Sequence, residues 1–292
     1  MTSPTQSSPA ILPHMRQSIQ TGGLIMLAQT PAVTAFNRIS VVSCYHDLPM
    51  REAARRIFRG TIDSATHPST THFLKGVSGH LVKEGARLVF KAPGIVFKPQ
   101  LDNYFKHTPR GKLKSDLIFS GSLSLAEVII NPADTVRTMW QANKKIKQVE
   151  KGKLLSHLYK GASANGLRQF GIWLGFPASE RLWSKALEDT TPLDPHSISG
   201  IVVKSIPQSF QITVPVWFFE RLKNELQYHP RLNETGKKTS RYVSAFRHVI
   251  HNQGWRGIFR GLTPKVWSNA VLVIGADYLL ERGRQSSKTK KN

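Results

Sequence analysis

The sequence predicts an all-α integral membrane protein, with six transmembrane helices in three repeats of about 100 residues. Three observations lead to this fold class. Four segments of spanning length carry few internal charges, two more are apolar on one side and basic on the other, and a short motif ending in glycine recurs three times. The 41 Lys and Arg outnumber the 18 Asp and Glu, and the resulting net charge of +23 indicates an anionic partner.

The six candidate spans are each about 20 residues long, which is the length a helix needs to cross a bilayer. They are residues 16–38, 77–101, 116–134, 162–187, 197–219 and 262–280. Lys83, Arg87 and Lys91 recur every four residues, so they share one helix face. Charges inside a span usually face a water-filled cavity or another helix. The mean hydropathy of −0.27 leaves open a soluble, basic protein built from amphipathic helices.

The repeats are marked by a triplet of an apolar or aromatic residue, a basic residue and glycine. The triplets are Leu74-Lys75-Gly76, Tyr159-Lys160-Gly161 and Phe259-Arg260-Gly261. Each precedes an apolar segment rich in small residues, and each follows a segment that contains or ends at a proline: Pro31, Pro132 and Pro215. Each unit is therefore predicted to consist of a helix, a polar connection and a second helix.

The spacing of these motifs gives the expected domain organisation. The repeats cover residues 15–102, 115–187 and 196–285, between a polar tail at 1–14 and a basic tail at 286–292. The first residues are rich in Ser, Thr and Pro and lack the Arg-rich pattern of a mitochondrial presequence.

The middle unit carries the sharpest motif, Pro132-x-Asp134-x-x-Arg137 followed by Gln141. This string resembles the signature of the mitochondrial carrier family, whose members are three-repeat, six-helix solute carriers. The segments 58–63, 158–163 and 253–261 are also similar to conserved junctions of that family. The resemblance covers nearly the whole chain, and it implies six transmembrane helices in three pseudo-symmetric repeats around a central cavity in the mitochondrial inner membrane.

The resemblance also implies a gate of ion pairs where the proline-containing helices converge. Only the second unit keeps both charges. Val33 and Phe36 replace them in the first unit, and Trp217 and Glu220 occupy the positions in the third. The usual network of three pairs is therefore not expected, although Arg137 can pair with Asp134 or reach Glu220. The candidate gate residues are Pro132, Asp134, Arg137, Gln141 and Glu220.

In the family, substrate contacts lie seven residues after the triplet glycines, which points here to Lys83, Arg168 and Ser268. Gln169 adjoins Arg168, and Lys265 lies one turn before Ser268. The candidate substrate-binding residues are Lys83, Arg87, Arg168, Gln169, Lys265 and Ser268. Because a cation inside a span is costly, these residues are interpreted as anion ligands, with snorkelling or pairing between helices as the alternative.

Two substrate classes remain open. Several cations with amide donors suit a nucleotide, and the degenerate repeats resemble a bacterial member of the family that acts on host mitochondria as an effector. ATP and ADP are therefore the expected substrates, moved by alternating access in an antiporter. The pair Arg168-Gln169 is more similar to carriers of keto acids or dicarboxylates.

The triplet glycines suggest a lipid site as well. Amides at a helix start bind phosphate, and in the family these positions hold cardiolipin. Gly76, Gly161 and Gly261 are the residues carried over, and plain helix starts at a membrane interface are the alternative. By the same resemblance the carrier is expected to work as a monomer.

Other functional classes fit less well. The sequence contains no P-loop, HExxH, GxSxG or EF-hand string, so an enzyme is not expected, and no cofactor or metal is predicted. The single cysteine, Cys44, excludes an internal disulfide framework. A soluble nucleic-acid-binding protein would suit the charge, but no recognition motif is present. A membrane adaptor that transports nothing is the other alternative, given the lost gate charges.

Overall fold

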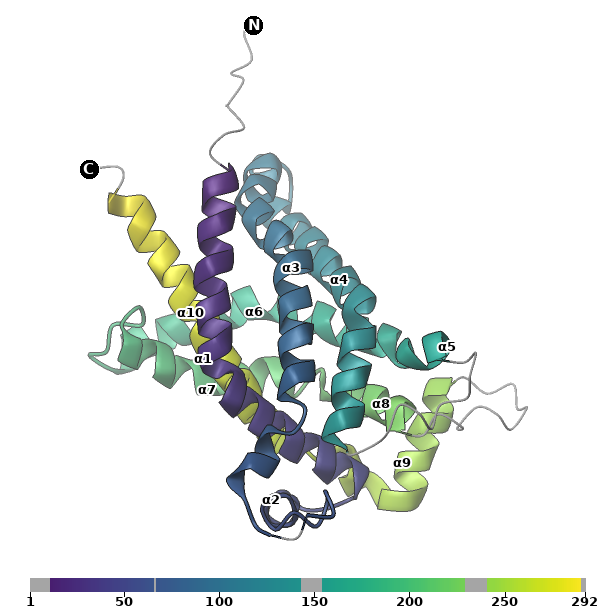
Figure 1. Cartoon of the computed structure of the whole chain (residues 1–292). Helices are drawn as coiled ribbons and strands as arrows, with labels where there is room; N and C mark the ends of the chain where they lie inside the picture. Colours follow the sequence, from purple (N-terminus) through teal and green to yellow (C-terminus); the bar gives the residue numbers. More distant parts are fainter. Residues whose placement is uncertain (1–10, 66, 143–153, 229–240, 290–292) are drawn as a thin grey trace, which may run out of the picture.

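The computed structural model describes residues 11–65, 67–142, 154–228 and 241–289, and the regular elements within these ranges are all helices (Figure 1). The predicted all-α class is therefore confirmed. In chain order the elements are α1 (Ile11–Tyr45), α2 (Met50–Phe58), η2 (Thr70–Leu74, a 3₁₀ turn), α3 (Val77–Phe105), α4 (Gly111–Gln141), α5 (Leu154–Leu158), α6 (Ala162–Thr190), α7 (Ile198–Thr213), α8 (Trp217–Tyr228), α9 (Arg241–Ile258) and α10 (Leu262–Thr289).

The long helices pack in a closed ring. Each contacts the next along the chain, from α1 through α3, α4, α6 and α7 to α10, and α10 packs back against α1. The first helix begins and the last helix ends at the same end of this ring, at the top of Figure 1. The interior of the ring is consequently lined by residues from all of these helices.

Short helices lie at the opposite end, where the ring helices meet. Small apolar clusters hold them there, such as Val42 of α1 with Ala53 and Ile57 of α2. Leu222 and Leu226 of α8 pack in the same way on Ala245 of α9. A long helix, a short helix and a second long helix follow one another in α1, α2 and α3 and again in α4, α5 and α6, whereas the last part of the chain holds the four helices α7 to α10. The repeats and domain boundaries drawn from the sequence stay a prediction.

The three prolines have different effects on their helices. Pro31 and Pro132 lie inside continuous helices, α1 and α4, whereas Pro215 lies between α7 and α8. Proline removes one backbone donor and its ring clashes with the preceding turn, which is the physical cause of such a break. As a result, α8 begins beyond Pro215 and carries Glu220 at a new angle.

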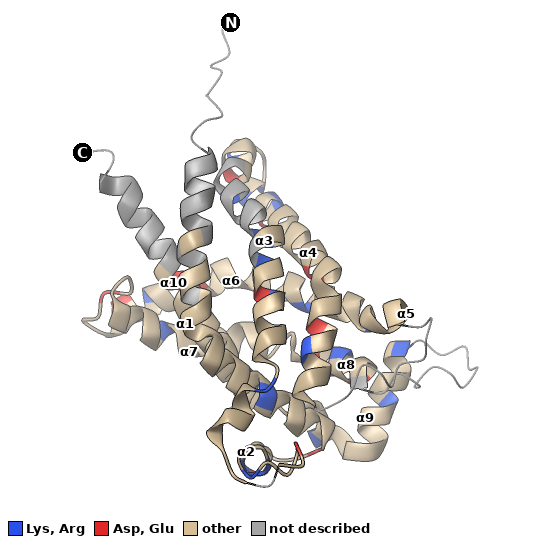
Figure 2. Cartoon of the chain, viewed as in Figure 1, with Lys and Arg blue, Asp and Glu red and all other residues tan. Residues whose placement is uncertain are grey.

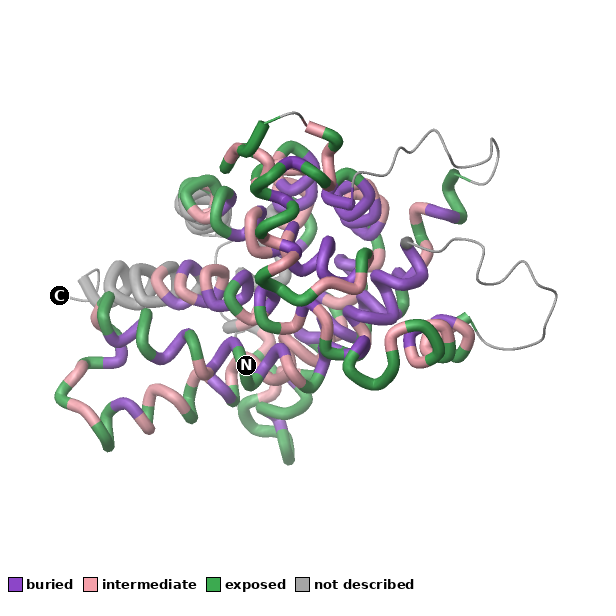
Figure 3. Tube along the Cα trace, turned by 90° about the horizontal axis from the view of Figure 1, so that it is seen from below, coloured by how far each residue is buried: buried purple, intermediate pink, exposed green. Residues whose placement is uncertain are grey.

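The polarity of the ring helices is reversed relative to a water-soluble bundle. Along α4 the buried side chains include Ser120, Glu127, Asn131 and Asp134. The exposed side chains of the same helix include six large apolar ones: Leu113, Leu117, Ile118, Leu125, Ile129 and Trp140. Seen from the end that carries α2 and α9, the buried residues gather toward the middle of the bundle (Figure 3). The interior is therefore polar, and much of the outer surface is apolar.

The six segments predicted to span a membrane all form helices. In the part of the chain that the structure describes, no helix combines the length and the apolar character needed to cross a membrane. Helix ends also differ from the expected boundaries. Helix α1 begins at residue 11, inside the predicted tail 1–14, and α10 runs to residue 289, because Arg, Gln and Lys near its end are good helix formers. Residues 1–10 and 290–292 of the two tails lie outside the described ranges.

Candidate functional site

A layer of buried polar residues crosses the ring, and its basic and acidic members are among the blue and red positions on the ribbon in Figure 2. Five of the ring helices and α8 contribute to it, because the layer lies in the last turns of α1 and α4, in α8, and in the first turns of α3, α6 and α10. All of its members are buried: Asn37, Lys83, Asp134, Arg137, Arg168, Glu220, Lys223, Lys265 and Ser268. Residues far apart in sequence thus form one closed network.

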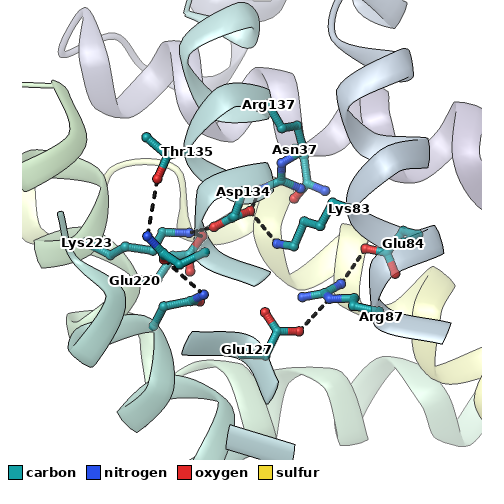
Figure 4. A network of polar contacts seen from close by, with 12 residues as sticks. Asn37, Lys83, Glu84, Arg87, Glu127, Asp134, Thr135, Arg137, Glu220 and Lys223 are labelled. Carbon is teal, nitrogen blue, oxygen red and sulfur yellow. Dashed lines mark hydrogen bonds and ion pairs between the residues drawn. The ribbon is translucent and has the colours of Figure 1, made fainter. Parts of the chain in front are cut away.

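Asp134 of α4 is the centre of this network (Figure 4). Its carboxylate pairs with Lys83 of α3, and it accepts from Lys223 Nζ of α8 at 2.8 Å. Arg137, one turn further along α4, lies 2.8 Å from the same carboxylate. Because Asp134 is fully buried, these three cations are what offsets the cost of removing its charge from water.

Glu220 of α8 forms the second centre. Its carboxylate lies 2.9 Å from Arg168 Nε of α6 and 3.9 Å from Lys265 Nζ of α10. Lys223 donates to it at 3.2 Å, so one lysine joins Glu220 to Asp134. The Arg168 contact is an ion pair without hydrogen-bond alignment, since neither of the two closest atoms has a hydrogen-bond partner within the described residues.

The first helix contributes an amide instead of a charge. Asn37 Oδ1 accepts from Lys265 Nζ at 2.9 Å and from Ser268 Oγ at 3.1 Å. Val33, at the position where the second unit has its acid, is fully buried. In this layer α1 thus contributes an uncharged acceptor to the Lys265 ammonium and the Ser268 hydroxyl, which agrees with the predicted loss of charges in the first unit.

A second ionic cluster lies beside this layer. Arg87 Nε and Lys91 Nζ of α3 contact the same oxygen of Glu127 on α4, at 2.5 and 2.6 Å. Arg87 also pairs with Glu84, one turn earlier on its own helix. With its amide oxygen turned toward the guanidiniums, Gln169 accepts from Arg168 at 2.5 Å and from Arg87 at 3.2 Å. Gln169 thereby connects the two clusters.

The charges of the two clusters do not balance. Seven cations face four carboxylates, which leaves an excess of three positive charges. The cations are Lys83, Arg87, Lys91, Arg137, Arg168, Lys223 and Lys265, and the carboxylates are Glu84, Glu127, Asp134 and Glu220. An uncompensated positive charge in a buried site favours binding of an anion.

A separate ion pair anchors α1 to the start of α3. Arg38, which is fully buried, binds Asp63 at 2.6 Å, and Lys75 Nζ donates to the same carboxylate at 2.7 Å. Burial acts to raise the pKa of Asp63, but the hydrogen bond from Lys75 and the charge of Arg38 outweigh it, so that pKa lies below its ordinary value. Asp63 belongs to the segment 58–63 that the sequence singled out.

The predicted substrate residues and gate residues are brought together in this structure. Lys83 contacts Asp134, and Arg168 and Lys265 contact Glu220. These contacts between helices are the pairing that the sequence left as an alternative to anion binding. The sequence offered Asp134 and Glu220 as partners for Arg137, and in the structure Arg137 pairs with Asp134. The roles of these residues in transport stay predictions.

Sequence reasoning missed Lys223, although it is the residue that joins the two carboxylates. A signal existed, because Lys223 follows Glu220 by three residues and so lies on the same helix face. Asn37 was missed as well, since the motif comparison examined only the charged positions of the first unit. Glu127 was given neither a role nor a partner from the sequence.

Gln141 is buried at the close contact between α4 and the start of α3. A Cβ added at Gly76 would lie 2.8 Å from Gln141 Cγ. Neither polar atom of the Gln141 side chain has a hydrogen-bond partner among the described residues, so its predicted bracing role is not tested. Another glutamine does link helices here: Gln227 of α8 donates to Thr135 Oγ1 of α4 at 2.9 Å.

Each triplet glycine directly precedes a long helix of the ring, as the sequence predicted. Gly76, Gly161 and Gly261 have φ of 86°, 77° and 78° and stand immediately before α3, α6 and α10. Left-handed backbone explains the choice of glycine without a ligand, so lipid binding stays a prediction. In the described ranges, no three His, Cys, Asp or Glu side chains are grouped as metal ligands.

Comparison with known proteins bears on the third predicted repeat. Residues 210–275 match the family model described as mitochondrial carrier protein. This segment contains Pro215, Glu220, Lys223, Lys265 and Ser268, so it overlaps the polar layer. No curated protein sequence matches the chain.

Proposed function

We propose that the chain is a member of the mitochondrial carrier family, whose model matches residues 210–275, and that it carries an anionic metabolite across the mitochondrial inner membrane by alternating access, with ATP and ADP as substrates. The family match supports a solute carrier rather than an enzyme. The identity of the substrate, the exchange mode and the location in the membrane are the parts that we add.

The observation that carries the proposal is the excess of three positive charges inside the ring. Buried cations without enough counter-ions are costly, and an anion that enters the ring relieves that cost. A nucleoside di- or triphosphate carries more negative charge than a dicarboxylate, and its phosphate oxygens accept from guanidinium and ammonium groups. Such an anion therefore fits the excess best.

The reversed polarity of the ring supports placement in a membrane. Large apolar side chains such as Leu117, Leu125 and Ile129 are exposed on α4, while Glu127, Asp134 and Arg137 of the same helix are buried. Large exposed apolar surfaces are rare on monomeric soluble proteins and mark contacts with a lipid or protein partner. Intramembrane charges are tolerated when they face a polar interior and pair there.

The pairing suggests how an anion opens the gate. Asp134 and Glu220 hold two cations, Lys83 and Arg168, that are also the predicted substrate contacts. An anion that binds these cations competes with the two carboxylates and so weakens the contacts between helices. Each buried pair contributes a few kcal/mol at most, because desolvation offsets attraction, and substrate binding can supply that amount. The gate then opens only when the site is occupied.

A keto acid or dicarboxylate is the second candidate substrate. The observation that favours it is the hydrogen-bonded group of Arg168, Gln169 and Arg87, which presents two guanidiniums close together. Arginine pairs readily with carboxylates in a bidentate manner. Reconstitution must therefore compare both classes of anion.

The test is uptake by liposomes that contain the purified protein, with labelled ATP and labelled 2-oxoglutarate, each with and without internal counter-substrate. We expect uptake of ATP that needs internal nucleotide. Lys83→Ala and Arg168→Ala should reduce it at least about tenfold, the loss of roughly 1.4 kcal/mol in binding. Lys114→Ala, at an exposed position of α4, is the matched control and should leave uptake unchanged.

Other outcomes would redirect the assignment. Uptake of 2-oxoglutarate alone would identify a keto-acid carrier. Absence of uptake of either anion by folded protein would favour the adaptor, and release from membranes by carbonate would favour the nucleic-acid-binding alternative.

We also propose that cardiolipin binds at the three triplet glycines, where Lys75, Lys160 and Arg260 add positive charge. Cardiolipin should then raise the midpoint of thermal unfolding more than phosphatidylcholine does. A monomer in light scattering, after correction for detergent, is the expected oligomeric state. An effect of cardiolipin no larger than that of phosphatidylcholine would remove the lipid site from the proposal.

A further inference from the structure

Glu127 is a buried carboxylate that the gate does not use. It lies on α4, seven residues before Asp134, so the two acids share one helix face about 10 Å apart along the axis. Its side chain is fully buried. One oxygen receives both Arg87 and Lys91, whereas the other has no hydrogen-bond partner among the described residues.

The two partners of Glu127 come from a different helix. Arg87 and Lys91 lie on α3, so the contact spans two ring helices and breaks if these helices separate or if another anion takes the cations. Glu84 provides a contrast. It pairs with Arg87 from within α3 itself, so its contact moves with the helix. An anion that takes Arg87 and Lys91 removes both cations from Glu127, and a separation of α3 from α4 breaks the contacts of Glu127 while it leaves that of Glu84 intact.

A carboxylate that loses its cations while it stays buried cannot remain charged at low cost. Burial of an unpaired charge is strongly unfavourable, and in practice the group takes up a proton instead. We infer that Glu127 accepts a proton when an anion binds Arg87 and Lys91, so that the carrier takes up one proton together with its anion. This inference rests on the proposed function, because it requires an anion in the ring.

The proton balance is simple. Water on the side to which the site is open supplies one proton to the carboxylate of Glu127. The proton leaves to water when the anion departs and Arg87 and Lys91 return to the carboxylate. No covalent bond of the anion changes.

The other charged groups near Glu127 define its surroundings. On α3 they are Lys83, Glu84, Arg87 and Lys91, with His80 one turn before Glu84. On α6 the charged neighbour of this cluster is Arg168, reached through Gln169. The contacts of α5 and α8 with α4 lie nearer its carboxyl end, where His157 of α5 and the pair of Glu220 and Lys223 are buried. An anion that binds Arg87 and Lys91 therefore takes both cations from Glu127, while Glu84 and His80 are the other titratable groups of α3 close to it.

His80 is the competing acceptor. It is buried, and its Nδ1 has no hydrogen-bond partner within the described ranges. Protonation would give the His80 imidazole a positive charge beside Lys83 and Arg87, which is less favourable than neutralising a carboxylate. A bound anion, however, would favour protonation of either group. The experiment must therefore separate the two residues.

The experiment is isothermal titration calorimetry of the purified full-length protein with ATP, and separately with 2-oxoglutarate, in two buffers with different ionisation enthalpies. The work is done at about pH 8, where a terminal phosphate has already lost its second proton. The difference in heat between buffers gives the number of protons taken up. We expect about one proton per bound anion for the wild-type protein.

Variants locate that proton. Glu127→Gln should bind the anion with no proton uptake, while Glu84→Gln and His80→Gln should keep it. Glu127→Asp preserves the carboxyl group and should also keep it, which covers the case in which Glu127→Gln does not fold. Anion binding without proton uptake by the wild-type protein would overturn the inference, as would loss of uptake in His80→Gln but not in Glu127→Gln. Absence of any binding by either anion would instead contradict the proposed function.

Discussion

Lys83 of α3 and Asp134 of α4 form a buried ion pair that joins a predicted substrate contact to a predicted gate residue. The same carboxylate holds Lys223 from α8 and Arg137 from its own helix. Asp134 therefore connects three helices of the ring, and Lys83 connects only two. The two ends of this ion pair are not equivalent.

This asymmetry predicts that Asp134→Asn is more harmful than Lys83→Met. Removing the carboxylate of Asp134 leaves three buried cations with less negative charge beside them. Breaking a buried pair in this way typically costs about 3–5 kcal/mol of unfolding free energy. The double variant should lose less than the sum of the single losses, with a coupling energy of roughly 1–3 kcal/mol. Chemical unfolding in detergent measures all three values. Strict additivity would show that the two side chains do not interact.

Lys223 should be essential for stability although it belongs to no recognised motif. Lys223→Gln leaves Asp134 and Glu220 close together without their shared cation, so we expect a loss of about 3 kcal/mol. Lys114→Gln, which removes an exposed lysine of α4, should change the unfolding free energy by less than about 0.5 kcal/mol. Equal effects of the two substitutions would argue against the bridging role.

Gly261 is predicted to tolerate no side chain. Its φ of 78° is left-handed, and an added Cβ would lie 2.7 Å from the Ser40 carbonyl oxygen and 2.8 Å from Cys44 Sγ. Gly261→Ala should therefore cost at least about 1–2 kcal/mol and loosen the contact of α10 with α1. Gly121→Ala is the control, since nothing lies within 4 Å of the added atom. In a helix interior that change is expected to stabilise by up to about 1 kcal/mol, and thermal unfolding distinguishes the two.

The contribution of Asp63 should depend on pH. Because its pKa is lower in the folded protein than its ordinary value, ionised Asp63 stabilises the fold above the unfolded pKa, and this stabilisation disappears as the pH falls through the folded value. Asp63→Asn should cost about 3 kcal/mol at neutral pH, since Arg38 is left buried with less compensation. The difference from the wild-type protein should shrink below about pH 4. A difference that stays constant with pH would contradict this account.

The sequence predicted much of the helical fold because the repeated features are local. A basic residue before a glycine marks a helix start, and the left-handed conformations of Gly76, Gly161 and Gly261 show why. The different behaviour of the three prolines was not predictable in the same way. Whether a proline bends or breaks a helix depends on packing from neighbouring helices, and only Pro215 separates two helices.

The sequence predicted which residues belong to the candidate site better than it predicted which of them contact one another. The resemblance to the family selected Lys83, Arg168 and Ser268, each seven residues after a triplet glycine, and Lys265 one turn before Ser268. Their partners depend on how the helices rotate against one another. The pairing of Arg168 with Glu220 joins α6 to α8 across 52 residues of chain, and the bridge made by Lys223 needs both carboxylates to be in place first. Such relationships are not visible in a motif.

The closed order of the helices has a consequence for biosynthesis. Asn37 of α1 finds Lys265 and Ser268 only after nearly the whole chain has been made, since the partners are 228 and 231 residues apart. Asp134 likewise pairs with Lys223 only after a further 89 residues have been synthesised. If the helices are inserted one at a time, these polar groups stay unpaired until α10 has been made. Unpaired polar groups inside a membrane raise the free energy of the chain, which favours its retention by chaperones. Nascent chains that stop before α10 should consequently be short-lived, and the final helix is the step that commits the protein to its mature state.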